Sequence, residues 1–426
     1  MNVLFCHPNF PAQFRGPAGL LGKDPANNVV FVTKTPRPDW EIPGVSKSVY
    51  TFKDEPKTEL GPVSGHYDVC TRHGQAVLRH CRTLQDQGFR PDVMVAHSGW
   101  GQSMYLRDAF PGVPLVSYFE WYYHDRSPDV LFTNSHPPLG KRVLLRSKST
   151  PILHDLASCS VGISPTAWQK YQFPSEFQHK IVQLHDGVDT EYMAPLPEGR
   201  PLPPALQLPV TGFSDGDELL TYVARGLEPY RGFPVFYAAL PAVLKARPGC
   251  RVLIVGSDRV CYGAPPRDGR NYRQIMQEKV KVDPERVRFT GSLSYGAYRA
   301  VLQASSVHAY LTWPFVLSWS MLEAMSCGCL LVGSNTPPVR ELIRHGENGL
   351  LTDMRSPEKV AQSLIHALER NSELEHLRTA ARKTILDNYD STRCLAANQR
   401  LLQCAAAGDF EPGNPARLSN LASFRI

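Results

Sequence analysis

The chain has 426 residues, of which 42% are hydrophobic and 20% charged, and this length suits two domains of about 150 to 200 residues each. Its formal charge of +6 suits a partner that carries phosphate, without choosing between a nucleotide, a lipid headgroup and a nucleic acid. No apolar run approaches the roughly 20 residues that cross a bilayer, and the N-terminus reads as a strand rather than a signal peptide, so we expect a cytoplasmic protein. The ten cysteines form no CxxC pair, which argues against a zinc site and a disulfide framework.

Short apolar strands alternate with helix-like stretches in the first half of the chain. A long helix is expected at Val69–Gln85, and the strands are expected at Val3–Cys6, Val29–Thr33, Val93–Ala96, Leu115–Tyr118 and Ser160–Ile163. This alternation predicts a parallel sheet wrapped by helices.

The second half repeats the plan. Strands are expected at Leu219–Ala224, Arg251–Val255, Val287–Thr290, Val307–Leu311 and Leu330–Val332, with helices at Pro234–Ala246, Tyr295–Ala304, Val339–His345, Pro357–Arg370 and Ser372–Asn388. The sequence therefore predicts two similar α/β domains.

A proline-rich segment with few large apolar residues separates the two halves, and we expect it to run as an extended linker. The predicted divisions are a first domain at 1–190, the linker at 191–217, a second domain at 218–390 and a C-terminal extension at 391–426. A return of the chain's C-terminal part to the first domain is left open.

One loop-to-helix segment near the C-terminal end carries a single acidic residue, Glu323, on its short helix, and Gly328 is expected to end that helix. This segment, Trp313–Cys329, resembles the donor-sugar loop of retaining glycosyltransferase family 4. The resemblance implies that the helix start and Phe315, Val316, Leu317 and Ser318 face the donor, with Glu323 accepting hydrogen bonds from sugar hydroxyls. A purely structural reading of Glu323 is a capping box with Ser320. The family usually has a further glutamate where this chain has Phe315.

A second motif, Arg225–Gly232, follows the first strand of the second domain. The family usually has arginine and then lysine here, and the resemblance implies that Arg225 and Arg231 bind the donor diphosphate. Two solvated arginines are the alternative. Further along, Arg288, Phe289 and Gly291 match the place where the family holds the donor base; an ordinary strand end with a turn glycine fits these residues equally well.

The resemblance covers nearly the whole chain and implies the GT-B architecture, in which two facing Rossmann-like, doubly wound domains close on a nucleotide sugar in an interdomain cleft. In the first domain, Gly16 stands alone in the loop where relatives often place two glycines near the diphosphate. Asp215-Gly216-Asp217 spells a metal-binding motif of another glycosyltransferase fold, but it lies among turn formers. We expect no essential metal and no cofactor beyond the nucleoside diphosphate sugar as co-substrate.

Polar residues also end two strands of the first domain. His97 and Glu120 are expected at the carboxyl edge of the sheet, where ligands of such folds bind, and both are candidate catalytic residues. His124, Asp125 and Trp121 follow and are candidate contacts to the acceptor. A satisfied structural histidine is the competing reading of His97 and His124.

A basic stretch on an expected helix of the first domain comprises Lys141, Arg142, Arg146 and Lys148. It is a candidate contact to the inner face of an anionic membrane or to nucleic acid, and a solvated helix face is the alternative.

The leading hypothesis is a retaining glycosyltransferase that moves a sugar from a nucleoside diphosphate donor to a hydroxyl acceptor, which could be a glycan, a lipid-linked sugar, a metabolite or a modified nucleic-acid base. The alternatives are a non-catalytic nucleotide-sugar or glycan-binding protein of the same fold and a nucleotide-sugar epimerase.

Overall fold

The computed structural model describes residues 1–52, 61–133, 135–197 and 218–410. These residues form two compact units, of which the first comprises Met1–Gly187 together with the chain from Ser391 onward, and the second comprises Val188–Asp390. The predicted linker from residue 198 and the Asp215-Gly216-Asp217 motif lie outside the described residues.

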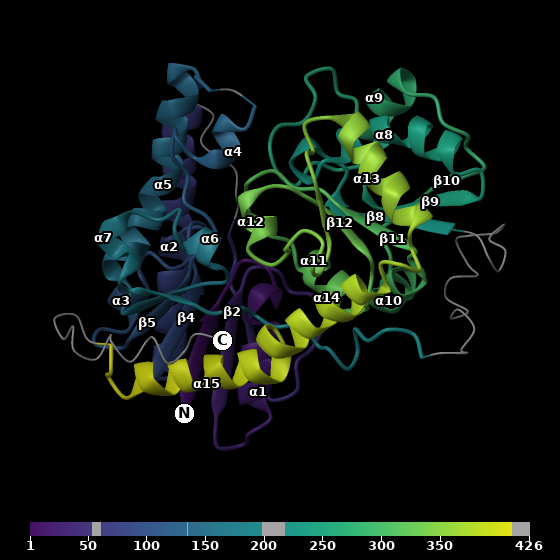
Figure 1. The fold of residues 1–426 in the computed structure, drawn as a ribbon. Helices are drawn as coiled ribbons and strands as arrows, with labels where there is room; N and C mark the ends of the chain where they lie inside the picture. Colours follow the sequence, from purple (N-terminus) through teal and green to yellow (C-terminus); the bar gives the residue numbers. More distant parts are fainter. Residues whose placement is uncertain (53–60, 134, 198–217, 411–426) are drawn as a thin grey trace. The chain divides into compact units, whose positions relative to one another are not determined.

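The first unit is built on a parallel sheet (Figure 1), whose strands lie in the order β3-β2-β1-β4-β5-β6-β7. Its strands are β1 (Asn2–Cys6), β2 (Asn28–Thr33), β3 (Val45–Val49), β4 (Val93–His97), β5 (Leu115–Tyr118), β6 (Val161–Ser164) and β7 (Ile181–Gln183). Its helices are α1 (Arg15–Gly22), α2 (Pro62–Asp86), α3 (Leu106–Ala109), α4 (Pro128–Leu131), α5 (Leu139–Ser158), α6 (Ala167–Lys170), α7 (Ser175–Gln178) and α15 (Ser391–Ala406).

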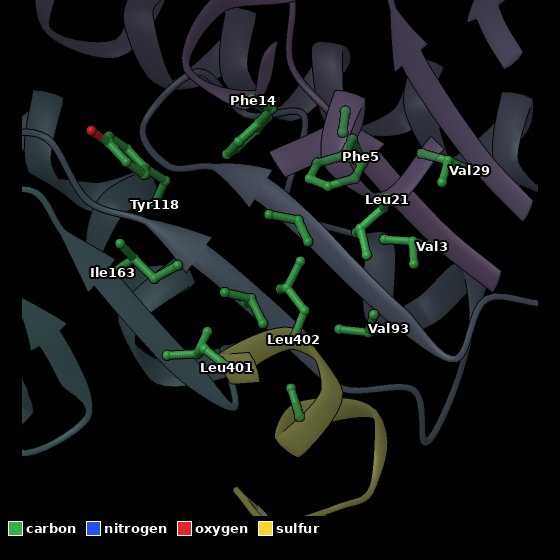
Figure 2. Close-up of a cluster of buried hydrophobic side chains, with 14 of the residues drawn as sticks. Val3, Phe5, Phe14, Leu21, Val29, Val93, Tyr118, Ile163, Leu401 and Leu402 are labelled. Carbon is green, nitrogen blue, oxygen red and sulfur yellow. The ribbon is translucent and has the colours of Figure 1, made fainter. Parts of the chain in front are cut away.

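Alternation along β1 explains how this sheet is covered on both faces. Leu4 and Cys6 point into the core beneath α2, α3 and α5, whereas Val3 and Phe5 point into the core beneath α1 and α15. Figure 2 shows Leu401 and Leu402 of α15 directed toward the sheet residues of the second of these clusters. The C-terminal helix α15 is therefore an integral layer of the first unit.

The second unit repeats this plan with a parallel sheet in the order β10-β9-β8-β11-β12-β13. Its strands are β8 (Glu218–Gly226), β9 (Cys250–Ser257), β10 (Val287–Gly291), β11 (Val307–Tyr310), β12 (Leu331–Ser334) and β13 (Leu350–Thr352). Its helices are α8 (Phe233–Ala246), α9 (Tyr272–Lys279), α10 (Tyr295–Ala304), α11 (Trp319–Ser326), α12 (Pro337–Arg340), α13 (Pro357–Glu369) and α14 (Glu375–Asn388).

Two details of the second unit differ from the predicted elements. The helix expected at Val339–His345 is the short α12, which ends at Arg340. The chain then turns around Asn348, whose side chain accepts from the amide of Arg344 and donates to the carbonyl of Leu342. The helix expected at Ser372–Asn388 forms as α14 but begins later, at Glu375, and it packs on α11 within the second unit.

Among the described residues, no helix is both long and apolar enough to pass through a membrane.

Candidate functional site

An irregularity in β8 determines how Arg225 is presented. The pairing of β8 with β9 shifts register between Val223 and Gly226, and such a bulge redirects the side chains within it. The Arg225 side chain is exposed and forms no hydrogen bond or salt bridge among the described residues. A cation with all its donors unused therefore stands at the carboxyl end of a central strand.

Arg231, the second cation of this motif, is in contrast buried and bonded. Its Nη1 atom donates to Thr312 Oγ1 at 2.9 Å and to the carbonyl oxygen of Val316 at 2.9 Å. The next residue, Gly232, has φ of +71°, and a Cβ there would lie 2.4 Å from Cβ of Leu311. This close approach requires glycine and places Arg231 directly beside the loop after β11.

Glu228, which lies between the two arginines, was missed by the sequence analysis. Its buried Oε2 atom accepts from the backbone amides of Cys261 and of Tyr262, the latter at 2.8 Å. Oε1 has no hydrogen-bond partner among the described residues. Burial raises the pKa of Glu228, while the amide bonds and the charges of Arg231 and Arg225 oppose that shift. Glu228 could have been found from the sequence, because it lies between the two arginines of one motif.

Phe315 occupies the place of the glutamate that the family usually has. The ring is buried and lies edge-on to Tyr230 and near Tyr262, with a centroid distance of 5.2 Å to each. Val316 and Leu317 are buried as well, so this loop offers backbone groups rather than their side chains. Arg231 already holds the Val316 carbonyl. The loop is thus packed as an aromatic and apolar wall.

Glu323 lies on α11 and does not form the capping box that was considered for it. The helix begins at Trp319 with Ser318 as its N-cap, and the Ser318 side chain accepts from the amide of Ser320. The Glu323 carboxylate instead accepts from the hydroxyls of Tyr295 and Tyr298 on α10, each at 2.8 Å. Burial raises the pKa of Glu323, and the two hydroxyl bonds oppose that shift. Glu323 is therefore a carboxylate fixed in place by two phenols.

The residues predicted to hold the donor base differ in how far neighbouring residues already engage them. Arg288 pairs with Glu285 at 3.0 Å at the surface. Phe289 packs against Phe233, and the guanidinium of Arg273 covers its ring at 3.9 Å, so this ring is part of the packed structure rather than an open stacking surface. Gly291 ends β10 with φ of +68° and open space where a Cβ would lie, although its carbonyl accepts from Thr290 Oγ1 at 2.9 Å.

Gly16 has a packing role in this structure. It is the second residue of α1, and a Cβ there would lie 2.7 Å from Cδ2 of Leu395 on α15. The expected contact of Gly16 with a diphosphate therefore has a concrete competitor, which is the close contact of α1 with α15.

The carboxyl edge of the first sheet gathers titratable side chains. His97 Nε2 lies 3.9 Å from Glu120 Oε2, and His97 Nδ1 lies 2.8 Å from the carbonyl oxygen of Ser98, so Nδ1 carries the proton. Nε2 has no hydrogen-bond partner among the described residues. Burial lowers the pKa of His97, although the charge of Glu120 opposes that shift. The pair leaves acceptor capacity on both His97 and the partly exposed Glu120.

Three further residues lie at this edge, of which His7 and Asp186 were missed. His7 follows β1, and its ring lies 5.1 Å from that of His97. Tyr118, the last residue of β5, donates to Asp186 Oδ2 at 3.2 Å, and burial raises the pKa of its phenol. Each residue ends or follows a strand of the parallel sheet, which is the signal by which His97 and Glu120 were found.

The three acceptor candidates after β5 are placed unequally. Trp121 is buried beside Trp168. His124 is half-buried, which lowers its pKa. Asp125 accepts from Arg142 Nε at 3.0 Å, and this bond lowers the pKa of Asp125.

The basic stretch lies on α5, where Lys141, Arg142 and Arg146 are exposed and Lys148 lies over the ring of Tyr123. Arg142 is partly neutralised by Asp125, so the four residues are not an unpaired cationic row.

Within the described ranges, no three His, Cys, Asp or Glu side chains come together as a metal site.

Comparison with known proteins identifies the family. The model described as "Glycosyl transferase family 4 group" matches residues 25–193, and the model described as "Glycosyl transferases group 1" matches residues 207–384. Both models describe glycosyltransferases, so the chain is a glycosyltransferase. The resemblance carried by Arg225–Gly232 and Trp313–Cys329 is thereby confirmed.

Relatives of this glycosyltransferase include the phosphatidyl-myo-inositol mannosyltransferase of Mycobacterium leprae, which is 24% identical over 243 residues, or 56% of each chain. An uncharacterized glycosyltransferase of Methanocaldococcus jannaschii is 25% identical over 118 residues, which are 28% of this chain and 30% of that one. The glycosyltransferase thus spans about half, or less, of the length of these curated relatives.

Solved structures confirm the GT-B fold. The sucrose-phosphate synthase of Thermosynechococcus elongatus superposes with a TM-score of 0.72 at 14% identity and covers 96% of this glycosyltransferase and 100% of that chain. Anabaena HepE in complex with UDP and glucose superposes with a TM-score of 0.67 at 15% identity, covering 95% of this chain and 99% of that one.

Proposed function

We propose that this glycosyltransferase moves a sugar from a nucleoside diphosphate donor to a hydroxyl acceptor with retention of configuration at the anomeric carbon. The observation that carries the proposal is the contrast between the two arginines of one motif. Arg225 is exposed with its donors unused, whereas Arg231 is buried and bonded to the loop that matches the family's donor loop.

The chemistry of the reaction indicates what these two arginines do. The bond between the anomeric carbon and the phosphate oxygen breaks, a bond to the acceptor oxygen forms, and the acceptor proton passes to the leaving phosphate. Negative charge grows on the diphosphate as the first bond lengthens. Arg225 binds this charge, and fixed cations of this kind stabilise a transition state by about 3 kcal/mol each. Arg231 contributes charge from a position that its contacts already fix.

The first unit supplies the acceptor side in this proposal. Glu120 accepts a hydrogen bond from a second hydroxyl of the acceptor, beside the one that reacts, and the unprotonated Nε2 of His97, 3.9 Å from that carboxylate, accepts from a further hydroxyl. Glu323, held by Tyr295 and Tyr298, accepts hydrogen bonds from hydroxyls of the donor.

A second candidate, a nucleotide-sugar-binding protein without turnover, is favoured by Phe315, whose buried ring replaces a carboxylate near the transferred sugar. UDP-glucose is the first donor to test, because Anabaena HepE was solved with it.

The test is a thermal-shift screen with a panel of nucleotide sugars, followed by product analysis in the presence of mixed hydroxyl acceptors. A raised midpoint together with a glycoside that keeps the donor's anomeric configuration supports the proposal. Tight binding without any donor breakdown supports the non-catalytic protein, and the absence of any nucleotide-dependent shift contradicts both.

A further inference from the structure

The loop that follows β4 presents a large aromatic side chain to solvent. Trp100 is 52% exposed, although Trp121, which follows the neighbouring strand β5, is 5% exposed. An exposed indole gives up the free energy that burial of its surface would supply. The two tryptophans that follow neighbouring strands therefore differ in how much indole surface a ligand can reach.

Side chains from two helices hold this loop. Asp155 on α5 accepts from Ser98 Oγ at 2.7 Å and from the amide of Gly99 at 3.2 Å. His73 on α2 lies with Nδ1 2.7 Å from the carbonyl oxygen of Trp100 itself, so that ring nitrogen donates. Buried side chains thus fix the conformation of this loop.

The backbone on both sides of Trp100 also requires glycine. Gly99 and Gly101 have φ of +92° and +89°, and a Cβ on Gly101 would lie 2.2 Å from the carbonyl oxygen of Cys70 on α2. The chain therefore combines an exposed indole with a rigid backbone. A rigid aromatic side chain loses little conformational entropy when a ligand covers it.

Hydrogen-bonding groups lie next to the indole. The rings of Trp100 and His97 are 6.5 Å apart between centroids, and His97 Nε2 is 3.9 Å from the carboxylate of Glu120. A flat apolar face near a histidine that is itself close to a carboxylate matches a sugar ring, which has an apolar face of C–H groups and a rim of hydroxyl donors.

We propose that Trp100 is a stacking platform for a sugar ring of the acceptor, so that the receiving hydroxyl belongs to a glycan or a glycoside. This inference rests on the proposed function, because it names the acceptor class of that transfer. A nucleic-acid acceptor also stacks on aromatic rings, but it brings phosphates toward the negative charge of Glu120.

The test uses the full chain and three variants. Trp100→Ala removes the platform, Trp100→Phe keeps an aromatic face, and Tyr171→Ala removes another exposed aromatic ring of the first unit as the control. Saturation-transfer NMR is recorded with methyl α-glucoside, methyl α-mannoside and methyl β-galactoside, and with a trinucleotide for comparison. In parallel, thermal shift with UDP-glucose and the other nucleotide sugars reports the donor side.

We expect at least one methyl glycoside to bind through its C–H face. Trp100→Ala should weaken this binding about tenfold or more, and Trp100→Phe should stay within about threefold, with the control unchanged. Equal binding by Trp100→Ala, the absence of any glycoside contact, or preferential binding of the trinucleotide overturns the inference. Failure of every nucleotide sugar to shift the wild-type midpoint contradicts the proposed function instead, because the glycoside measurements are made without a donor.

Discussion

The carboxyl edges of the two sheets differ in how completely their charged groups are already bonded. In the second unit, Arg231 and Glu323 each make two hydrogen bonds to neighbouring groups of the same unit. In the first unit, His97 Nε2 has no hydrogen-bond partner among the described residues, and Glu120 is partly exposed. These two charged side chains of the second unit are thus already held in place by hydrogen bonds within the protein. In the first unit, hydrogen-bonding groups remain available to a ligand.

Arg225 is the exception within the second unit, and its replacement should have the largest effect. Arg225→Ala should lower donor turnover by about 100-fold to 1,000-fold, because a cation aimed at the leaving diphosphate is lost. Stability should change by less than about 0.5 kcal/mol, because the side chain is exposed and forms no hydrogen bond or salt bridge. Steady-state kinetics and urea unfolding measure the two effects.

The control for this variant is Arg344→Ala, which removes another exposed arginine of the second unit. Its turnover should match the wild type. A fall of similar size in both variants would show that net charge, rather than the position of Arg225, is responsible.

Acidification probes a buried histidine of the second unit. His308 is fully buried with Nδ1 2.8 Å from Thr221 Oγ1, and burial lowers its pKa from 6.5 to about 4. As the pH falls from 6.5 toward 4, the unfolded chain therefore binds a proton on this histidine before the folded chain does. The stability that depends on a neutral His308 is complete above pH 6.5 and is lost as the pH falls toward 4. The loss is on the order of 3 kcal/mol.

Urea unfolding at pH 7 and pH 4 of the wild type and His308→Gln checks this expectation. The variant should be less stable at pH 7 and should lose less on acidification. An equal acid loss in both proteins would assign the effect to other groups.

Glu120→Gln sharpens the comparison from the side of the first unit. The amide keeps the shape but loses the charge that accepts from a neighbouring hydroxyl of the acceptor, so transfer should slow by about tenfold to 100-fold. Breakdown of the donor by water should be unchanged. Parallel assays with and without the acceptor separate the two rates, and equal losses in both would contradict an acceptor-side role.

The smallest effect is expected for Tyr295→Phe. This change removes one of two hydroxyls that fix Glu323, which corresponds to about 1 kcal/mol and a several-fold rise in the KM for the donor. An unchanged KM for the donor would indicate that the bond from Tyr298 alone holds the carboxylate.

The regular parts of this fold could be predicted because burial on both faces leaves a clear pattern. Leu115–Tyr118 and Tyr295–Ala304 form with the predicted bounds. The edge strands Val45–Val49 and Ile181–Gln183 were missed, since they are short and the first is partly exposed.

The candidate site was predictable in its motifs but not in its contacts. That Arg231 would be bonded depends on the loop after β11, about 80 residues away in the sequence, and the exposure of Arg225 depends on the irregular pairing of β8 with β9. Gly16 and Phe289 pack against α15 and α8, which no local pattern reveals. His7 and Asp186 could have been found, because each follows a strand of the parallel sheet.

Calorimetric titration of UDP into the wild type, Arg225→Ala and Glu120→Gln tests most directly whether the second unit binds the leaving diphosphate. We predict that UDP affinity falls about tenfold or more in Arg225→Ala and is unchanged in Glu120→Gln. Equal affinity in the wild type and Arg225→Ala, or a loss confined to Glu120→Gln, would contradict the assignment.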